Sequence, residues 1–362
     1  MRVLHVLGTL ARGGVETRLL EALRQLDPTR VRFDVCLIGA NEGVYAPDVR
    51  ALGAQVLTCR LRPGQATFLG RLARTIRRGS YDVIHSHVHQ FSGVVLLAAW
   101  LAGIRGRCAL LHSESDGHRS TVRRRLYRRF TRRLLASTAT EIVAASEAIL
   151  DSLWRSNWRT DPRCRVIYVG PDTRRFRHAG VSREDRMRRV RERGGPVLIH
   201  VARFAPVKNH ESLVPIAREV LARWPGARFV LAGDGPLFAR IQDLIDRAHL
   251  TGAFRFLGDR GDIPGLLAEA DVLLLPSLWE GLPGVVMEAL AVGVPVVGSP
   301  IRPIQEIARH NKGVVVADPR NPTAFASAID EAIDSPLVEL SEEFSAEAAT
   351  NALTQLYETY RS

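Results

Sequence analysis

The sequence predicts an α/β protein made of two domains, each built around a doubly wound parallel β-sheet. Its 362 residues are too many for one ordinary hydrophobic core and fit two domains of roughly 150–180 residues each. Short runs of β-branched and aliphatic residues alternate with amphipathic helical patterns, which is typical of parallel sheets covered by helices. A polar, arginine-rich segment at 172–195 interrupts the alternation and indicates where the domains join.

The expected strands fall into two series along the chain. The first series comprises 3–7, 33–38, 55–59, 83–85, 108–112 and 141–145. The second comprises 164–168, 197–201, 227–232, 254–257, 272–275, 294–298 and 313–317. Helical patterns lie between most strands, for example at 15–26, 213–223 and 237–248. We therefore expect an N-terminal domain over 1–172, joined by a C-terminal helix at 345–362, and a C-terminal domain over 173–344.

The composition is that of a soluble protein with an unusual choice of basic residues. Hydrophobic residues make up 46 % and charged residues 24 % of the chain, and the longest apolar run, 93–104, is too short to span a bilayer. The first residues read as a β-strand rather than a signal peptide, and the four cysteines form no CxxC pair, so we expect a cytoplasmic protein. The net charge is +12, yet Lys208 and Lys312 are the only lysines.

Glycines and cations follow two of the expected strands, where ligands bind in open parallel sheets. Gly13 and Gly14 lie between the first strand and its helix, where a backbone without side chains can approach an anion. This pair alone could equally be a plain turn. Arg203 and Lys208 follow the strand at 197–201 and could clamp a pyrophosphate, although a solvated loop is the alternative. Lys208 is the stronger signal, because the chain otherwise avoids lysine.

Two glutamates eight residues apart form the most specific motif. Glu280 lies in the loop after the strand at 272–275, and Glu288 lies in a helical pattern that is otherwise apolar. A carboxylate among apolar residues needs a partner, because burying an unpaired charge is costly. Sugar and ribose hydroxyls are suitable partners. The alternative is a surface helix with one exposed glutamate.

Together these residues resemble the family 4 glycosyltransferases, which are retaining enzymes with the GT-B architecture of two Rossmann-like domains facing each other across a cleft. The resemblance is carried by the spaced glutamates, the glycine loop, the Arg203 and Lys208 pair and the strings EGLPGVVMEALAVGVPVVGSP, VARFAPVKNHE, LAGDGP and FLGDRGDIPGLLAEADVLLLPS. It covers nearly the whole chain. The N-terminal half is similar to transferases of exopolysaccharide or capsule assembly, whose acceptors are usually lipid-linked sugars.

The resemblance implies a nucleotide-diphosphate sugar donor, bound by the C-terminal domain, and an acceptor bound by the N-terminal domain. Arg203 and Lys208 would hold the diphosphate, Glu280 the hydroxyls of the donor sugar and Glu288 those of the ribose. Backbone N–H groups of Gly13, Gly14 and Leu282 could add to the diphosphate site. Gly281 would also line the donor site, and the base would lie near Leu257. The resemblance implies no metal and no cofactor, since the donor is a substrate. Front-face substitution is expected, because neither Glu114 nor Asp116 is singled out as a nucleophile.

Histidines gather at the ends of two expected strands in the first domain. His85, His87 and His89 end one strand, and His112 ends another. The resemblance implies that His112 lies near the donor sugar and acts in catalysis, and His87 is the candidate for the acceptor side. A metal at the HxHxH pattern is not expected, because no carboxylate pattern accompanies it. For His85 and His89 we expect packing or hydrogen-bonding roles.

Eight arginines occur between Arg119 and Arg133, with apolar residues at helical spacing among them. Such a helix could dock on anionic lipids at the inner face of the cell membrane, or it could pack its apolar stripe on its own domain. Two other functions are weighed against sugar transfer. A nucleotide-sugar 2-epimerase could share the fold, and the charge could indicate nucleic-acid binding, which the 6 % of aromatic residues and the lack of a known motif disfavour.

Overall fold

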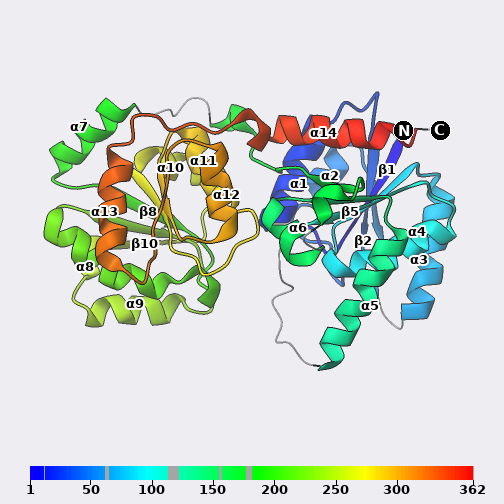
Figure 1. The fold of residues 1–362 in the computed structure, drawn as a ribbon, viewed down its shortest axis with the longest axis horizontal. Helices are drawn as coiled ribbons and strands as arrows, with labels where there is room; N and C mark the ends of the chain where they lie inside the picture. Colours follow the sequence, from blue (N-terminus) through cyan, green and yellow to red (C-terminus); the bar gives the residue numbers. More distant parts are fainter. Residues whose placement is uncertain (12, 62–64, 113–121, 155–156, 177–181, 362) are drawn as a thin grey trace. The chain divides into compact units, whose positions relative to one another are not determined.

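The computed structural model describes the chain except residues 12, 62–64, 113–121, 155–156, 177–181 and 362. It divides into two compact units, one formed by Met1–Val169 with Ala346–Ser362 and the other by Gly170–Ser345 (Figure 1). Each unit is described by itself below. None of the described helices is long and apolar enough to cross a membrane.

The first unit contains a fully parallel sheet of seven strands in the order β3-β2-β1-β4-β5-β6-β7. The strands are β1 (Arg2–Leu7), β2 (Arg32–Leu37), β3 (Val56–Thr58), β4 (Val83–Ser86), β5 (Gly106–Leu111), β6 (Glu141–Ala144) and β7 (Cys164–Val166). One expectation is corrected here. The strand expected to open the second series is β7, which pairs with β6 and therefore completes the first sheet.

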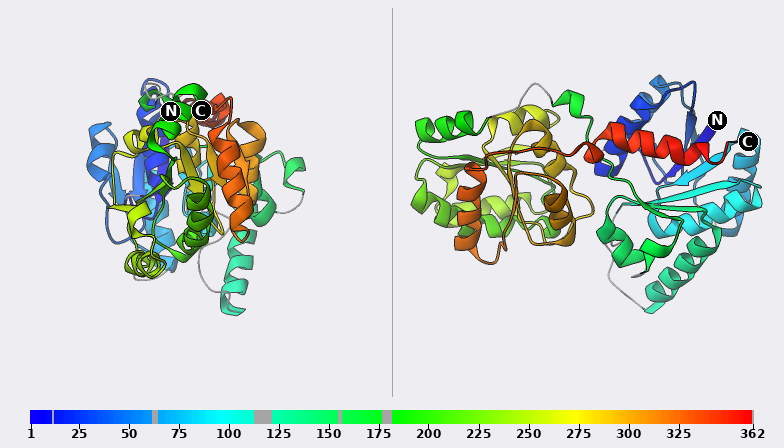
Figure 2. Two further views of the ribbon diagram at one scale, coloured as in Figure 1. Left: turned by 90° about the vertical axis from the view of Figure 1, so that its left-hand side faces the viewer. Right: turned by 45° about the horizontal axis from the view of Figure 1, so that its top comes forward.

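Helices cover both faces of this sheet, and the last one returns from the far end of the chain. They are α1 (Gly14–Gln25), α2 (Ala46–Ala51), α3 (Gln65–Gly79), α4 (Ser92–Leu101), α5 (Val122–Thr138), α6 (Glu147–Leu153) and α14 (Ala346–Glu358). Helix α14 lies beside α1 (Figures 1 and 2). Its Tyr357 is buried in the core with Val3 and Val83, and Arg30 donates two hydrogen bonds of 2.8 Å to Glu358. Core packing and this ion pair both attach α14 to the first unit.

The second unit repeats the architecture with a parallel sheet of six strands in the order β10-β9-β8-β11-β12-β13. The strands are β8 (Val197–Val201), β9 (Arg228–Ala232), β10 (Phe254–Gly258), β11 (Val272–Leu275), β12 (Val296–Gly298) and β13 (Val314–Val316). The helices are α7 (Arg183–Arg193), α8 (Leu213–Arg223), α9 (Phe238–Arg247), α10 (Ile263–Glu269), α11 (Gly284–Val292), α12 (Arg302–His310) and α13 (Pro322–Ile333).

Helix α7 lies in the segment that the sequence analysis interpreted as a polar connection between domains. The hydroxyl of Ser182 accepts a hydrogen bond of 3.1 Å from the backbone N–H of Asp185, which caps the helix start. Arg186 is 2 % exposed and donates to the carbonyls of Ile333 and Ser335 at 2.9 and 2.6 Å. The segment is therefore partly an element of the second unit, and its arginines do more than solvate a linker.

In both parallel sheets the order in which strands are added reverses at a defined point. From β1 the order continues through β2 and β3 on one side and through β4 on the other, and from β8 it continues through β9 on one side and β11 on the other. The loops that leave two such neighbouring strands diverge and open a crevice at the carboxyl edge of the sheet. The loops after β1 and β4, and after β8 and β11, are therefore where a ligand is expected in each unit.

Candidate functional site

An ion pair bridges the β8/β11 point of the second unit. Lys208 follows β8, Glu280 follows β11, and the ammonium nitrogen of Lys208 lies 2.6 and 2.8 Å from the two carboxylate oxygens of Glu280. Glu280 is 8 % exposed, and the Lys208 side chain is 23 % exposed. A nearly buried carboxylate is thus neutralised by one of the chain's two lysines at the position where the fold opens a crevice.

The two loops that carry this pair are bound to each other through their backbones. The N–H of Leu278 donates to the carbonyl of Val207 at 2.8 Å, and the side-chain amide of Asn209 donates to the carbonyl of Pro276 at 3.0 Å. Asn209 adopts a left-handed conformation with φ of 54°, which asparagine tolerates better than most residues. These hydrogen bonds hold the two loops together and so keep Lys208 and Glu280 close to each other.

The loop after β9 supports the same site from the other side. Gly233 has φ of 137°, and a Cβ there would lie 2.0 Å from the carbonyl oxygen of Ala202. The N–H of Phe204 donates to the carbonyl of Asp234 at 3.0 Å. Only glycine at position 233 permits the two backbones to come this close. This contact holds in place the loop that carries Arg203.

The other predicted donor-site residues of the second unit lie at or near this edge but outside the ion pair. Arg203 is exposed, and its guanidinium makes no hydrogen bond or ion pair with any residue that the structure describes. Glu288 lies half-buried on α11, next to the buried Met287 and Ala289. The half-buried Gly281 and Leu282 precede that helix, and Leu257 is half-buried in β10.

Three buried polar residues in β8 and in the loops after β8 and β11 were not predicted as site residues. His200 lies in β8, and its Nδ1 is 2.8 Å from the carbonyl oxygen of Leu274. His210 stacks on Phe204 with ring centroids 4.1 Å apart, and neither its ring nitrogens nor the hydroxyl of Ser277 has a hydrogen-bond partner within the described chain. Burial lowers the pKa of His200 to about 4 and that of His210 to about 3. The only sequence signal was a histidine inside an otherwise apolar strand.

A second cluster, here called the histidine array, lies at the β1/β4 point of the first unit. It consists of His5, His85, His87 and His112. His5 on β1 and His85 on β4 are register partners and share one face of the sheet with His87. Nδ1 of His5 is 3.0 Å from Nε2 of His87, whose Nδ1 is 3.2 Å from Nε2 of His112. The hydroxyl of Tyr357 from α14 bonds Nδ1 of His85.

Burial keeps the whole array neutral at pH 7. It lowers the pKa of His5 and of His112 to about 3, and it also holds the pKa of His85 and His87 well below the usual value, with neighbouring imidazoles as a second cause. The sequence placed His87 and His112 at strand ends and gave His85 a hydrogen-bonding role. It missed His5, which lies within the apolar strand RVLHVL and reads there as a core residue.

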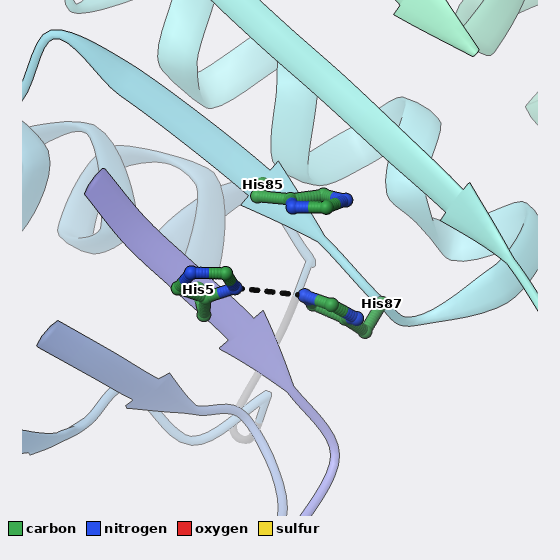
Figure 3. A group of neighbouring side chains, drawn as sticks. All are labelled: His5, His85 and His87. Atoms are coloured by element: carbon green, nitrogen blue, oxygen red, sulfur yellow. Dashed lines mark hydrogen bonds between the residues drawn. The ribbon is translucent and has the colours of Figure 1, made fainter. Parts of the chain in front are cut away.

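Three imidazoles of the array meet the simplest requirement for a metal site (Figure 3). His5, His85 and His87 offer nitrogen atoms within 4.8 Å of one another. A tetrahedral ion bound at 2.0–2.1 Å needs nitrogens about 3.4 Å apart, so the group would have to contract. Two of these nitrogens already share a hydrogen bond, and no carboxylate contributes to the pKa of any of the three within the described chain. The geometry therefore fits a hydrogen-bonded network better than a buried dication.

The predicted glycine loop also lies in the first unit. Gly13 is the extended N-cap of α1, and Gly14 is its exposed first residue. The N–H groups of the first turn point away from the helix and can donate to an anion. Glu16 lies in the same turn, and burial raises the pKa of its carboxyl. Arg119, Glu114 and Asp116 lie outside the described residues.

Comparison with known proteins identifies the family. Residues 13–170 match the model of the glycosyl transferase 4-like domain, and residues 181–351 match that of the glycosyl transferases group 1. The chain is 32 % identical over 298 residues to EpsF of Bacillus subtilis, which is described as a glycosyltransferase. The match covers 81 % of this chain and 78 % of EpsF. The chain belongs to the family 4 glycosyltransferases.

Two further relatives agree with this assignment. The crystal structure of Anabaena HepE in complex with UDP and glucose superimposes with a TM-score of 0.75 over 99 % of this chain and 98 % of HepE, at 22 % identity. The fold of this family 4 glycosyltransferase is therefore GT-B, with two Rossmann-like domains. An Escherichia coli enzyme named UDP-Gal:alpha-D-GlcNAc-diphosphoundecaprenol alpha-1,3-galactosyltransferase is 27 % identical over 237 residues, which is 64 % of this chain and 60 % of that enzyme.

Proposed function

We propose that this glycosyltransferase moves a hexose, with retention of configuration, from a nucleotide-diphosphate sugar to a lipid-linked saccharide during synthesis of a cell-surface polysaccharide. The observation that carries the proposal is the Lys208–Glu280 pair at the β8/β11 point. An ammonium and a carboxylate side by side can bind a diphosphate and a sugar hydroxyl at once. The UDP and glucose in HepE and the diphosphoundecaprenol substrate in the name of the E. coli relative support the donor and acceptor classes.

The second unit supplies the charges that the leaving group needs. Lys208 and the exposed Arg203 neutralise the diphosphate as negative charge develops on it, so the proposal includes no metal ion. The carboxylate of Glu280 accepts hydrogen bonds from hydroxyls of the donor sugar, and that of Glu288 accepts from the ribose. The N–H groups of Gly281 and Leu282 donate to phosphate oxygens, and the base lies at the end of β10.

Retention follows from substitution on one face of the sugar. The acceptor hydroxyl oxygen forms its bond to the anomeric carbon on the side from which the diphosphate oxygen departs. The bond between that carbon and the diphosphate breaks, and the proton of the hydroxyl passes to a phosphate oxygen of the leaving group. The cations at the β8/β11 point stabilise the diphosphate through this step, which is where most of the acceleration is expected.

A transfer assay tests this function. The purified chain is incubated with UDP-, GDP- and ADP-hexoses and a short-chain analogue of a lipid diphosphate sugar, and NMR of the product gives the anomeric configuration. We expect one donor to react with retention, and Lys208→Ala to lower kcat about 100-fold or more. Lys312→Ala is the matched control, because Lys312 is exposed and far from the β8 and β11 loops in the sheet order. An inverted product or equal effects of the two lysine variants would contradict the proposal.

We also propose that α5 docks on anionic membrane lipids and so brings the enzyme to its acceptor. Helix α5 projects from the rest of its unit (Figures 1 and 2). Leu126 and Phe130 are 64 % and 61 % exposed, so the outer part of the apolar stripe does not pack on its own domain, whereas Leu135 at the inner end is buried. Five arginines of α5 line a groove on this helix together with Ala136, Trp154, Asn157, Asp161 and Arg163; they are Arg125, Arg128, Arg129, Arg132 and Arg133. Exposed apolar side chains between arginines suit a negatively charged lipid surface.

Sedimentation with vesicles tests the docking. Vesicles with one third phosphatidylglycerol should carry down the wild-type chain, and vesicles of phosphatidylcholine alone should not. The double variant Leu126→Ser, Phe130→Ser should stay in the supernatant. Trp100→Ser is the control, since Trp100 is 57 % exposed but lies on α4. Equal binding to both vesicle types, or by the double variant, would contradict the role of α5.

A further inference from the structure

The histidine array forms a continuous hydrogen-bonded chain that leads from inside the first sheet to its carboxyl edge. It begins at His5 on β1, which is 1 % exposed, passes through His87 directly after β4, and ends at the half-buried His112 directly after β5. The two links measure 3.0 and 3.2 Å. The imidazole of His87 stacks on that of His112 with an interplanar angle of 17°. Figure 3 shows the first link, in which a nitrogen of His5 faces one of His87.

Such a chain can run in only two directions. A neutral imidazole has one nitrogen that donates and one that accepts, and burial keeps all three imidazoles neutral at pH 7. Either every N–H points from His5 towards His112, or every N–H points back towards His5. The direction fixes which nitrogen of His112 carries the proton.

The inner end of the chain distinguishes the two directions. Nε2 of His5 is buried and has no hydrogen-bond partner within the part of the chain that the structure describes. If the N–H groups point towards His112, Nε2 of His5 carries a lone pair that accepts no hydrogen bond. If they point the other way, this atom is a buried N–H without an acceptor, and orphaned buried N–H groups are rarer in proteins than under-used acceptors. The direction in which the N–H groups point towards His112 therefore costs less free energy at the inner end.

We propose that His5 and His87 are positioning residues that hold His112 as the neutral tautomer with its proton on Nδ1. Nε2 of His112 then accepts from His87, and Nδ1–H is the group that His112 offers at the edge of the sheet. His112 thus serves as a hydrogen-bond donor to a substrate oxygen rather than as a base. The hydrogen bond from His112 to a substrate oxygen rests on the proposed function, whereas the tautomer of His112 is a property of the free protein.

The surroundings of the array contain further titratable groups. His85 lies 4.4 Å from His87 and 5.3 Å from His5 between ring centroids, and Tyr357 reaches the array from α14. His89 disfavours protonation of His112, and His85 disfavours protonation of His87. Burial raises the pKa of Tyr357 well above its usual value, so the phenol stays neutral as well. His85 and Tyr357 therefore place no charge beside the hydrogen-bonded histidines at pH 7.

Nitrogen NMR of the full-length protein, labelled with 15N-histidine, tests the tautomer. Free histidine prefers its proton on Nε2, so a proton on Nδ1 of His112 is diagnostic of the chain. We expect Nδ1–H on His112 and His87 in the wild type. His87→Phe removes the donor to Nε2 of His112 and should return His112 to the Nε2–H form. His5→Asn retains a donor near the position of Nδ1 and should preserve the wild-type signals, and His249→Gln, an exposed position in the second unit, should change nothing in the array.

Several outcomes would overturn the proposal. These are Nε2–H on His112 in the wild type, Nδ1–H retained on His112 in His87→Phe, or stoichiometric perturbation of His5, His85 and His87 by added zinc chloride, which would show that their nitrogens are metal ligands. Kinetics adds a second readout. His5→Phe should lower kcat on the order of ten-fold with KM for the donor changed less than about two-fold, and His5→Asn should restore it. If the chain transfers no sugar but the tautomer is as expected, the proposed function fails and the positioning of His112 stands.

Discussion

Removing the ammonium of Lys208 should destabilise the second unit by an amount that its burial sets. In Lys208→Met the carboxylate of Glu280, 8 % exposed, loses the cation that lies 2.6 and 2.8 Å from its oxygens. Breaking a fully buried ion pair by deleting one partner costs about 3–5 kcal/mol. Because the Lys208 side chain is 23 % exposed, solvent screens part of this interaction, and we expect a loss of about 2 kcal/mol.

A double-mutant cycle measures the coupling directly. Glu280→Gln leaves an ammonium that can still reach water, so it should cost about 1 kcal/mol, and the double variant should cost no more than that because no unpaired carboxylate remains. The coupling energy is then about 2 kcal/mol. Because two units need not unfold together, the loss should be read from hydrogen exchange of peptides from β8 and β11 alongside denaturant unfolding.

Simple addition of the stability losses of the two single variants would contradict coupling between Lys208 and Glu280. Additivity within about 0.5 kcal/mol would mean that the two charges do not sense each other in solution. Lys312→Met serves as the control for loss of a positive charge, since Lys312 is exposed. An equal loss of stability in that variant would show that net charge, and not the pair, determines the effect.

Three further predictions concern packing and pH. Gly233→Ala should lower the free energy of unfolding by more than about 1 kcal/mol in denaturant titrations, because its Cβ would lie 2.0 Å from the oxygen of Ala202 at φ of 137°. Tyr357→Phe removes the hydroxyl that bonds His85 and should cost about 1 kcal/mol in the same assay, with α14 exchanging amide hydrogens faster. In the folded protein the pKa of His210 is lowered to about 3, so the imidazole of the unfolded chain takes up a proton at higher pH than that of the folded chain. The free energy of unfolding should therefore be full above pH 6.5 and fall as the pH drops from 6.5 towards 3. Urea midpoints measured across that range would show this fall.

Local patterns were sufficient to locate the strands. Strands such as β8 and β11 begin and end where the apolar runs do, because a strand buried on both faces leaves an uninterrupted apolar signature. The strand at β7 was found but assigned to the wrong series. Its partner β6 is chosen by tertiary pairing, which no local signal encodes. Helix α7 was missed because its many arginines resemble a solvated linker, although Ser182 and Gly194 mark its two ends.

Site residues could be predicted from the sequence where the residue type is unusual for its position, and could not be predicted where it is ordinary. Lys208 stood out because the chain almost never uses lysine, and Glu280 because of its spacing from Glu288. Nothing in the sequence indicated that Lys208 and Glu280 would touch, since that contact depends on β8 and β11 being neighbours in the sheet. His5 was missed for the same reason, because only strand register brings it beside the histidine that follows β4.

The most direct test of the account is binding of nucleoside diphosphates to the free protein, measured as a thermal shift with UDP, GDP, ADP and TDP. A ligand at about a hundred times its dissociation constant should add roughly 2.7 kcal/mol to the stability. The account predicts that one diphosphate raises the melting temperature and that Glu288→Ala and Lys208→Ala each reduce the shift, while Lys312→Ala leaves it intact. A shift produced by none of the four, or one that all three variants retain, would contradict a donor site at the carboxyl edge of the second sheet.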